Sequence, residues 1–299
     1  MADKKIVEIF DDIEFNHVFG LKGLDSTITG QNVFGELKWD GAKPGHSWTI
    51  TEWNSAHLLK DEVTAIKTAN GGIDFNNESK SVVIYPGKNM ISLKTLCSKE
   101  YKAPRKSHTD PWIHLLLEQK VPENRSVFLA DVAHMFVELE FEIPFDKNMM
   151  TEKEFNPDMH TSQVSWYFTI ENAASEKLDF EGRPDYYWFG LPLYDHRFGI
   201  FKGEDIQYDR GTQKLIYKMD ESSYIKDDKI QIGKTYSFKI DIIENLKKGF
   251  DLTKKEGWLK GAEWKDMKIG STNIGWENPG TLDSEFFIKK ISVKAELKD

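Results

Sequence analysis

The stretch QVSWYFTI at residues 163–170 alternates polar and apolar side chains along its whole length. One parity is formed by Gln163, Ser165, Tyr167 and Thr169, and the other by Val164, Trp166, Phe168 and Ile170. Because successive side chains of a β-strand point to opposite faces of its sheet, each set lies on one side. The stretch therefore predicts a strand with one apolar core face and one face of polar and aromatic groups.

Three other stretches, at residues 112–119, 137–143 and 186–196, repeat this alternation. Their non-core parities are formed by Trp112, His114, Leu116 and Glu118, by Glu138, Glu140 and Glu142, and by Tyr186, Trp188, Tyr194 and His196. If these strands are neighbours, one concave sheet face would gather carboxylates, amides, imidazoles and indoles. That composition is typical of a groove that holds a glycan.

Turn signals recur between short runs of β-branched and aromatic residues, for example at residues 70–72, 86–87, 181–184 and 278–280. Many short strands joined by frequent turns predict an all-β, antiparallel two-sheet sandwich of the jelly-roll type. Residues 243–268 are the exception, because Ile243, Leu246 and Phe250 keep helical spacing. We expect one or two short helices there, laid over a sheet edge.

The length of 299 residues fits one large all-β domain. The polar, basic and proline-containing stretch at residues 99–110 is the best candidate for a domain boundary. We favour the alternative that it is a long loop, so that residues 1–299 form a single sandwich domain with an N-terminal extension.

Composition narrows the classes of partner. A net charge of −9 with scattered lysines argues against a nucleic-acid partner, which requires clustered Lys and Arg. No apolar run approaches the roughly 20 residues that span a bilayer, so no membrane partner is expected. The N-terminus shows no signal peptide and Cys97 is the only cysteine. We therefore expect a cytoplasmic protein, unless a secretion signal has been removed.

The three glutamates of residues 138–142 form the first candidate catalytic set. Glycoside hydrolysis uses two carboxyl groups, and crowded carboxylates raise the pKa of at least one of them. Glu138 and Glu140 are predicted to supply one carboxyl function, with Glu118 and His114 as its partner. The alternative is an outward strand face whose glutamates meet lysines on adjacent strands.

The aromatic and polar residues of the other stretches are the candidate sugar-binding set. Aromatic rings can stack on sugars, and amide, imidazole and guanidinium groups can bind sugar hydroxyl groups. The predicted substrate-binding residues are Trp112, Gln163, Tyr167, Tyr186, Trp188, His196 and Arg197. For Trp112, His114 and Glu118, a core histidine bonded to a glutamate is an equally weighted alternative.

Metal-binding spacings are absent from the sequence. The eight histidines contain no H-x-H or H-x-x-x-H pair, and a single cysteine allows no C-x-x-C. We predict no metal site and no cofactor, with calcium the one ion that Asp and Glu carboxylates could bind.

The stretches 112–119 and 188–197, with the closing segments 273–280 and 285–293, resemble the concanavalin A-like lectin and glucanase sandwiches, including bacterial proteins of this shape. Within that superfamily, the family-sixteen type glucanases carry E-x-D-x-E on a central strand. Glu138, Glu140 and Glu142 have the same spacing, with Glu in place of the central Asp. The resemblance implies a jelly roll whose concave sheet holds a sugar chain.

Together these features predict a carbohydrate-active protein that acts on an oligo- or polysaccharide, as a glycoside hydrolase or a polysaccharide lyase. The alternative is a non-catalytic glycan-binding protein that uses Trp112, Tyr186 and Trp188 as stacking surfaces. A structural or assembly protein would need an exposed apolar patch, which the sequence does not identify.

Overall fold

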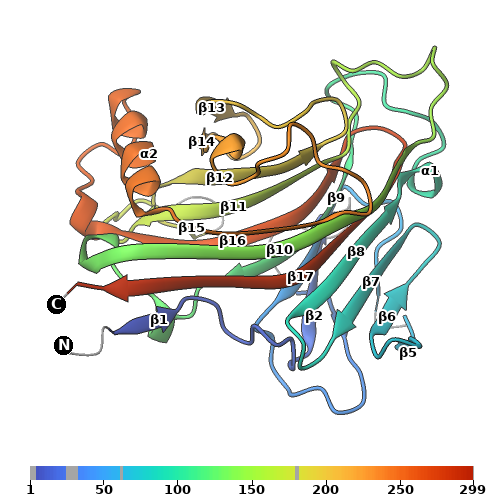
Figure 1. The fold of residues 1–299 in the computed structure, drawn as a ribbon, viewed down its shortest axis with the longest axis horizontal. Coiled ribbons are helices and arrows are strands. Elements are labelled where there is room, and N and C mark those ends of the chain that lie inside the picture. The colour runs from blue at the N-terminus through green and yellow to red at the C-terminus, as the bar shows by residue number, and fades with distance from the viewer. Residues whose placement is uncertain (1–4, 25–32, 61–62, 179–181, 299) are drawn as a thin grey trace.

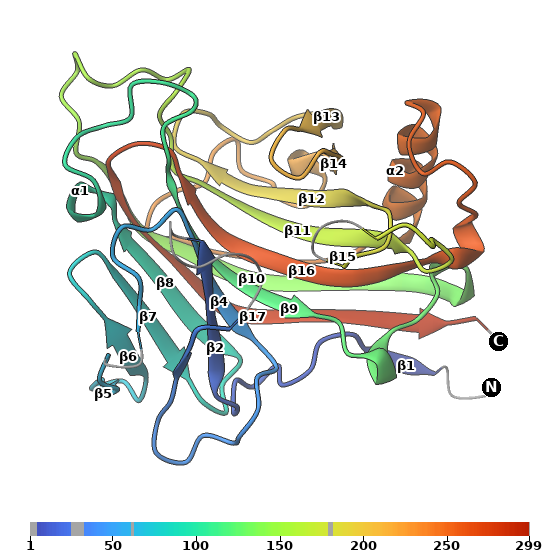
Figure 2. The same ribbon diagram turned by 180° about the vertical axis from the view of Figure 1, so that it is seen from behind.

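The computed structural model describes residues 5–24, 33–60, 63–178 and 182–298. Its strands form two sheets, one of eight and one of nine strands within these residues, which pack face to face (Figure 1). Strands β2 and β4 of one sheet lie in front of β7 and β8 of the other in Figure 2. The predicted all-β two-sheet sandwich is confirmed.

The nine-stranded sheet has the order β13-β14-β12-β11-β16-β9-β4-β2-β3. Its strands are β2 (Phe19–Leu24), β3 (Gly35–Leu37), β4 (Thr49–Trp53), β9 (Ile113–Lys120), β11 (Gln163–Asn172), β12 (Tyr186–Asp195), β13 (Asp205–Asp209), β14 (Lys214–Lys218) and β16 (Met267–Asn278). Its pairs are antiparallel except β2 with β4 and β12 with β14. Three of the four alternating stretches therefore belong to this sheet.

The eight-stranded sheet has the order β15-β10-β17-β8-β7-β6-β5, with β1 paired to β17. Its strands are β1 (Ile6–Glu8), β5 (Ile66–Lys67), β6 (Ile73–Asn76), β7 (Lys80–Tyr85), β8 (Met90–Leu96), β10 (Val132–Asn148), β15 (Thr235–Asp241) and β17 (Leu282–Leu297). The long antiparallel pair β10–β17 forms its centre.

The core lies between the sheets and follows the predicted apolar parity. One continuous cluster of buried side chains includes Trp166 and Phe168 of β11 as well as Leu139 and Phe141 of β10. This cluster contains residues from Ile9 to Ala295, so segments on both sides of the 99–110 loop contribute to it. Trp166 donates its indole N–H to the Thr272 hydroxyl at 2.8 Å, which satisfies its polar atom within the core.

One helix closes an open edge of the sandwich. Helix α2 (Ile243–Lys255) stands beside β12 and β14 (Figure 1) and packs Leu246 and Phe250 into the core. The Tyr187 hydroxyl of β12 donates to the backbone carbonyl of Leu246 at 2.6 Å. The predicted helix over a sheet edge is confirmed, although it ends at Lys255 and only the short turn η4 (Trp264–Asp266) follows within 243–268.

The remaining helical elements are short. They are α1 (Cys97–Glu100), η1 (Glu123–Arg125), η2 (Leu129–Asp131) and η3 (Glu221–Ser223). Among the residues described above, no helix is long and apolar enough to cross a membrane.

Candidate functional site

The outer face of the nine-stranded sheet carries a continuous set of polar and aromatic side chains, which we call the polar face. Its members are Thr51 (β4), His114 and Glu118 (β9), Gln163, Ser165, Tyr167, Thr169 and Glu171 (β11), Trp188 (β12), and Ser271, Asn273 and Glu277 (β16). Strand register aligns them in rows, such as Glu118 opposite Asn273 and Asn273 opposite Tyr167. From Gln163 to Glu171 the face extends about 26 Å, at about 3.3 Å per residue.

Aromatic rings occupy the centre of the polar face. Tyr167 and Trp188 meet edge to face with ring centroids 6.1 Å apart. The Trp188 indole N–H donates to the Thr212 hydroxyl at 3.1 Å, which ties this ring to the β13–β14 turn. The Tyr167 ring lies over Gly190, where an added Cβ would come within 2.5 Å of Cε1. Gly190 is therefore the residue that allows this ring to lie flat on the sheet.

The side chain of Glu118, which lies opposite Asn273 in the strand register, is held by two hydrogen bonds. Its carboxylate accepts hydrogen bonds from the Lys22 ammonium group at 2.7 Å and from the Thr51 hydroxyl at 3.2 Å. Both Lys22 and Glu118 are largely covered, so solvent screens this pair less than a pair on an open surface. The carboxylate consequently points toward β4 and β2, away from β16.

One end of the polar face is formed by His114, Glu277 and Gln163. Gln163 donates to the Glu277 carboxylate at 2.8 Å, and Glu277 lies opposite His114 in the strand register. Burial lowers the pKa of His114, and the negative charge of Glu277 opposes this shift only in part. The imidazole is therefore expected to be neutral at neutral pH. Burial and the Glu277 charge both raise the pKa of Tyr167, which keeps its hydroxyl protonated.

The predicted convergence of the glutamates of β10 with this face is wrong. Glu138 and Glu140 lie on β10, in the eight-stranded sheet, and project from the opposite outer surface of the sandwich. Glu138 accepts a hydrogen bond from Lys290 at 2.6 Å, and Glu142 accepts one from Lys289 at 2.6 Å. The alternative of a charged strand face paired with neighbouring lysines is the one that the structure shows.

Two predicted stacking residues have less free ring surface than expected. Tyr186 shares the outer parity of Trp188, but only 1% of it is exposed. Trp112 adjoins His114 with ring centroids 5.5 Å apart, and the Arg105 guanidinium lies over its ring at 4.6 Å. Trp188 is itself only 9% exposed and packs against Tyr186, with ring centroids 5.5 Å apart, so it presents an edge of its ring, whereas Tyr167 is half-buried.

The predicted binding residues at the end of β12 are engaged within the protein. Arg197 forms a two-point ion pair with Asp195 and donates to the Pro157 carbonyl at 3.0 Å. His196 donates through Nδ1 to the buried carboxylate of Asp146 at 2.6 Å. These contacts give both residues a role in holding the strand end, and neither lies within the rows of the polar face.

Three residues of the polar face are absent from the predicted site residues, namely Asn273, Glu277 and Glu171. The segment 267–278 is a long strand in the structure, whereas part of it was predicted to be a closing loop. The alternation of Asn273, Gly275 and Glu277 with Ile274 and Trp276 is the signal that could have placed them. Its two glycines weaken the strand signal, which explains why the pattern points to a turn.

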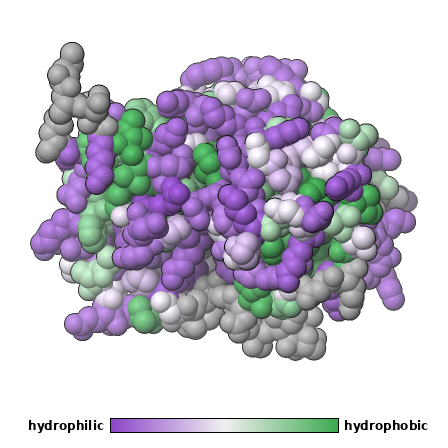
Figure 3. Space-filling view, turned by 90° about the horizontal axis from the view of Figure 1, so that it is seen from below, coloured by the Kyte–Doolittle hydropathy of each residue, from purple (hydrophilic) through white to green (hydrophobic). Residues whose placement is uncertain are grey.

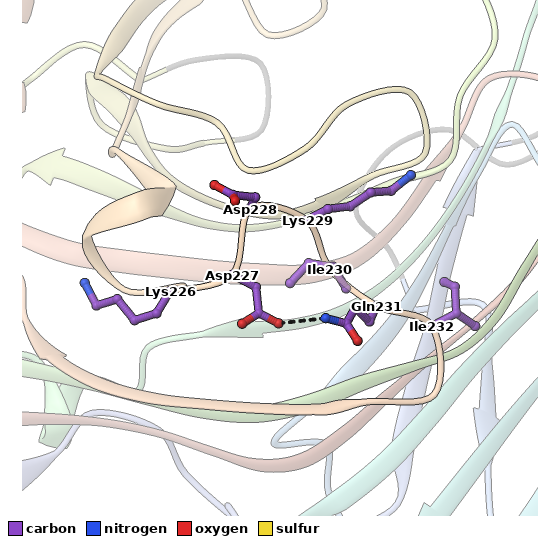
Figure 4. Close-up of a pocket in the computed structure, with 7 residues that line it drawn as sticks. All are labelled: Lys226, Asp227, Asp228, Lys229, Ile230, Gln231 and Ile232. Atoms are coloured by element: carbon purple, nitrogen blue, oxygen red, sulfur yellow. Dashed lines mark hydrogen bonds between the residues drawn. The ribbon is translucent and has the colours of Figure 1, made fainter.

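Two hollows of the surface are lined by residues outside the polar face. One of about 690 Å³ is lined by residues 226–232, where Gln231 donates to Asp227 at 3.3 Å (Figure 4). Another of about 360 Å³ includes Trp39, Lys67 and Ile73. Within the residues that the structure describes, no three His, Cys, Asp or Glu side chains are grouped to hold a metal ion.

Comparison with known proteins returns solved structures only. No family model and no curated protein matches the chain. The chain is similar to a family 12 xyloglucanase from Bacillus licheniformis, with 11% identity, 77% of this chain and 96% of that chain covered, and a TM-score of 0.43. It is also similar to a cellulase derived from Cel12A of Rhodothermus marinus, with 9% identity, 78% and 96% covered, and a TM-score of 0.41. At such low identities and TM-scores, these structures do not show the activity of this chain.

Proposed function

We propose that the chain is a carbohydrate-active protein whose oligosaccharide ligand lies along the polar face. One observation supports this above the others. Trp188 and Tyr167 form an aromatic centre on the same sheet face as Glu118, Asn273 and Gln163. Sugars present apolar C–H surfaces, which stack on aromatic rings, and hydroxyl groups, which pair with carboxylates and amides.

Hydrolysis of a glycosidic bond is the first candidate reaction, with Glu277 and Glu118 as the two carboxyl groups. They lie on neighbouring strands of one face, but Glu277 is four residues beyond Asn273, the partner of Glu118. That offset places their backbones about 13 Å apart along the strand. Glycosidases need their carboxyl groups about 5–10 Å apart. The two glutamate side chains would therefore have to turn toward each other when a substrate binds.

Binding without cleavage is the second candidate, and one observation favours it. Lys22 and Thr51 hold Glu118 toward β4, whereas Gln163 holds Glu277 on the side of β11. In this arrangement both carboxylates are acceptors for hydrogen bonds, as a sugar-binding surface requires.

A third class, an assembly protein, would need a wide apolar surface. The surface seen in Figure 3 is mostly hydrophilic, with small and separated apolar areas. Large exposed apolar residues, such as Ile6, Phe198 and Tyr208, are scattered over different strands and loops. The face that Figure 3 shows therefore offers no wide apolar surface to a protein partner.

The test is a panel of soluble oligosaccharides, measured for binding by calorimetry and for new reducing ends. Glu277→Gln and Glu118→Gln are compared with Glu140→Gln, a matched strand glutamate on the opposite sheet. Loss of turnover with retained binding in Glu277→Gln, and no change in Glu140→Gln, supports hydrolysis. Binding without any new reducing ends in the unaltered protein supports the second candidate. Absence of binding to every sugar overturns the proposal.

A further inference from the structure

Basic side chains gather at the end of the polar face that lies away from His114 and Glu277. Lys120 ends β9, Lys268 is near the start of β16, and Lys214 begins β14. Register places Lys120 opposite Ser271, and Glu171 opposite both Lys268 and Tyr186. Arg183, in the loop before β12, joins them, so four separate segments bring cations to this one end.

Two of these cations frame the Tyr186 ring. The Arg183 guanidinium lies 4.7 Å and the Lys214 ammonium group 4.8 Å from its centroid. Lys214 is also paired with Asp185 at 2.7 Å, and its charge is therefore partly neutralised. This contact fixes the position of Lys214 at the edge of the cluster.

The two lysines of β9 and β16 are less well compensated. Lys268 lies 3.9 Å from Glu123, whose side chain is 93% exposed, so solvent strongly screens that pair. Lys120 is exposed at the strand end, and the structure records no ion pair for it within the described residues. These two ammonium groups can receive an additional anion.

Glu171 is the carboxyl group that lies among these cations. It is 7% exposed, lies against Gly270 and accepts a hydrogen bond from the Thr169 hydroxyl at 3.1 Å. Burial raises its pKa, while Lys268, Lys120 and Arg183 work in the opposite direction.

We propose that Lys120 and Lys268, with Arg183 beside them, form a subsite for an anionic substituent of the saccharide, either a carboxylate or a sulfate ester. This inference rests on the proposed function, because it places the subsite on the same polar face. The charges along the face differ in sign, with Glu277 at one end and the lysines at the other. An acidic sugar would consequently bind in one direction.

The experiment measures binding of three oligosaccharides of equal length by calorimetry. These are a neutral β-glucan hexasaccharide, an oligogalacturonate for the carboxylate arm and a carrageenan hexasaccharide for the sulfate arm. We compare the unaltered protein with a Lys120→Ala, Lys268→Met double variant. Lys294→Ala is the matched control, because Lys294 is an exposed strand lysine on the opposite sheet. Thermal unfolding establishes that each variant is folded.

We expect an acidic oligosaccharide to bind more tightly than the neutral one. The double variant should bind it about tenfold more weakly, the order given by a few partly exposed ion pairs. Raising NaCl from about 0.05 M to about 0.5 M should reduce this preference, because the charges are screened. Binding of the neutral hexasaccharide should not be weakened in the double variant, and the Lys294→Ala protein should bind the acidic sugar as tightly as the unaltered protein. The acidic sugar that shows the preference identifies the substituent as a carboxylate or a sulfate ester.

Equal binding of neutral and acidic sugars, or an acidic preference that persists in the double variant, overturns the subsite while leaving the proposed function intact. Failure of all three sugars to bind also overturns the subsite, and it overturns the proposed function only if no sugar of the wider panel binds.

Discussion

The ammonium group of Lys80 lies 3.2 Å from the carboxylate of Glu100, and neither side chain is exposed to solvent. A second buried carboxylate, that of Glu52, lies 3.4 Å from the same ammonium group. Glu52 is on β4 of the nine-stranded sheet, Lys80 is on β7 of the eight-stranded sheet, and Glu100 ends α1. This ion network therefore joins the two layers of the sandwich beneath the edge of the polar face.

Replacing Lys80 by methionine should destabilise the fold strongly. The substitution keeps the volume of the side chain but leaves two buried carboxylates without their cation. Removal of one partner from a buried ion network costs about 3–5 kcal/mol. Urea unfolding should show this loss, whereas Lys67→Met, at an exposed position of β5, should change stability by less than about 0.5 kcal/mol. Equal stability of the two variants would show that the network contributes little.

Glu52 should make stability fall as the pH rises from about 4.5 to about 7. Burial raises its pKa from 4.5 to about 7 in the folded state, although Lys80 acts in the opposite direction. The folded protein therefore binds more protons than the unfolded chain within this window, so the free energy of unfolding decreases with pH there. A Glu52→Gln variant should lack this slope when unfolding is measured at several pH values. An unchanged slope in the variant would exclude Glu52 as its source.

Asp146 should have the opposite effect at low pH. Its buried carboxylate accepts hydrogen bonds from Ser162, Ser284 and Tyr194 at 2.6–2.7 Å, in addition to its contact with His196. Burial opposes ionisation, but these bonds outweigh it and lower the pKa of Asp146 below 3.8. The stability that they supply is present above pH 3.8 and is lost as the pH falls through the lower folded-state value.

An Asp146→Ala variant should test this interpretation. It leaves several buried donors without an acceptor and should lose at least about 3 kcal/mol at neutral pH. The difference from the unaltered protein should shrink during acid unfolding, monitored by circular dichroism. A difference that is constant down to pH 2 would contradict a role for the ionised carboxylate.

Gly190→Ala should disturb ligand binding through Tyr167. The new Cβ would lie 2.5 Å from Cε1 of the Tyr167 ring, closer than packed atoms allow, so the ring has to move off the sheet. We expect weaker saccharide binding by about 1 kcal/mol, comparable to the loss of one aromatic contact. Gly211→Ala is the control, because its nearest neighbour would be at 3.4 Å. Similar binding by both variants would remove Tyr167 from the site.

Trp188→Ala should weaken saccharide binding by about 1–2 kcal/mol, as expected for the loss of a stacking ring. Trp188→Phe keeps a ring but removes the N–H group that bonds Thr212, and should therefore bind with intermediate affinity. Calorimetry with the best ligand of the panel distinguishes these variants. A full-affinity Trp188→Ala protein would show that the ligand does not contact the aromatic centre.

The alternation of side chains determines much of this molecule without any knowledge of distant contacts. The parity of residues 163–170 identifies Trp166 and Phe168 as core residues and Gln163 and Tyr167 as outward residues, and all four lie as expected. Period-two alternation is a local property of the extended chain, which is why it can be recognised in a short stretch. The same reasoning correctly separates the two faces of the strand with Glu138 and Glu140.

Which strands are neighbours was decided only by the tertiary structure. Glu118 and Glu138 have similar local patterns, but β9 pairs with β16 and β10 pairs with β17, in different sheets. These pairings join segments about 150 residues apart in sequence, as Glu138 opposite Ser292 and Glu118 opposite Asn273 show. Alternation assigns each side chain to one of the two faces of its strand. The sheet to which that strand belongs depends on long-range pairing and on the packing of both layers. Strand patterns could therefore predict the composition of a polar face, whereas only the folded chain decided that Glu118 belongs to it and Glu138 does not.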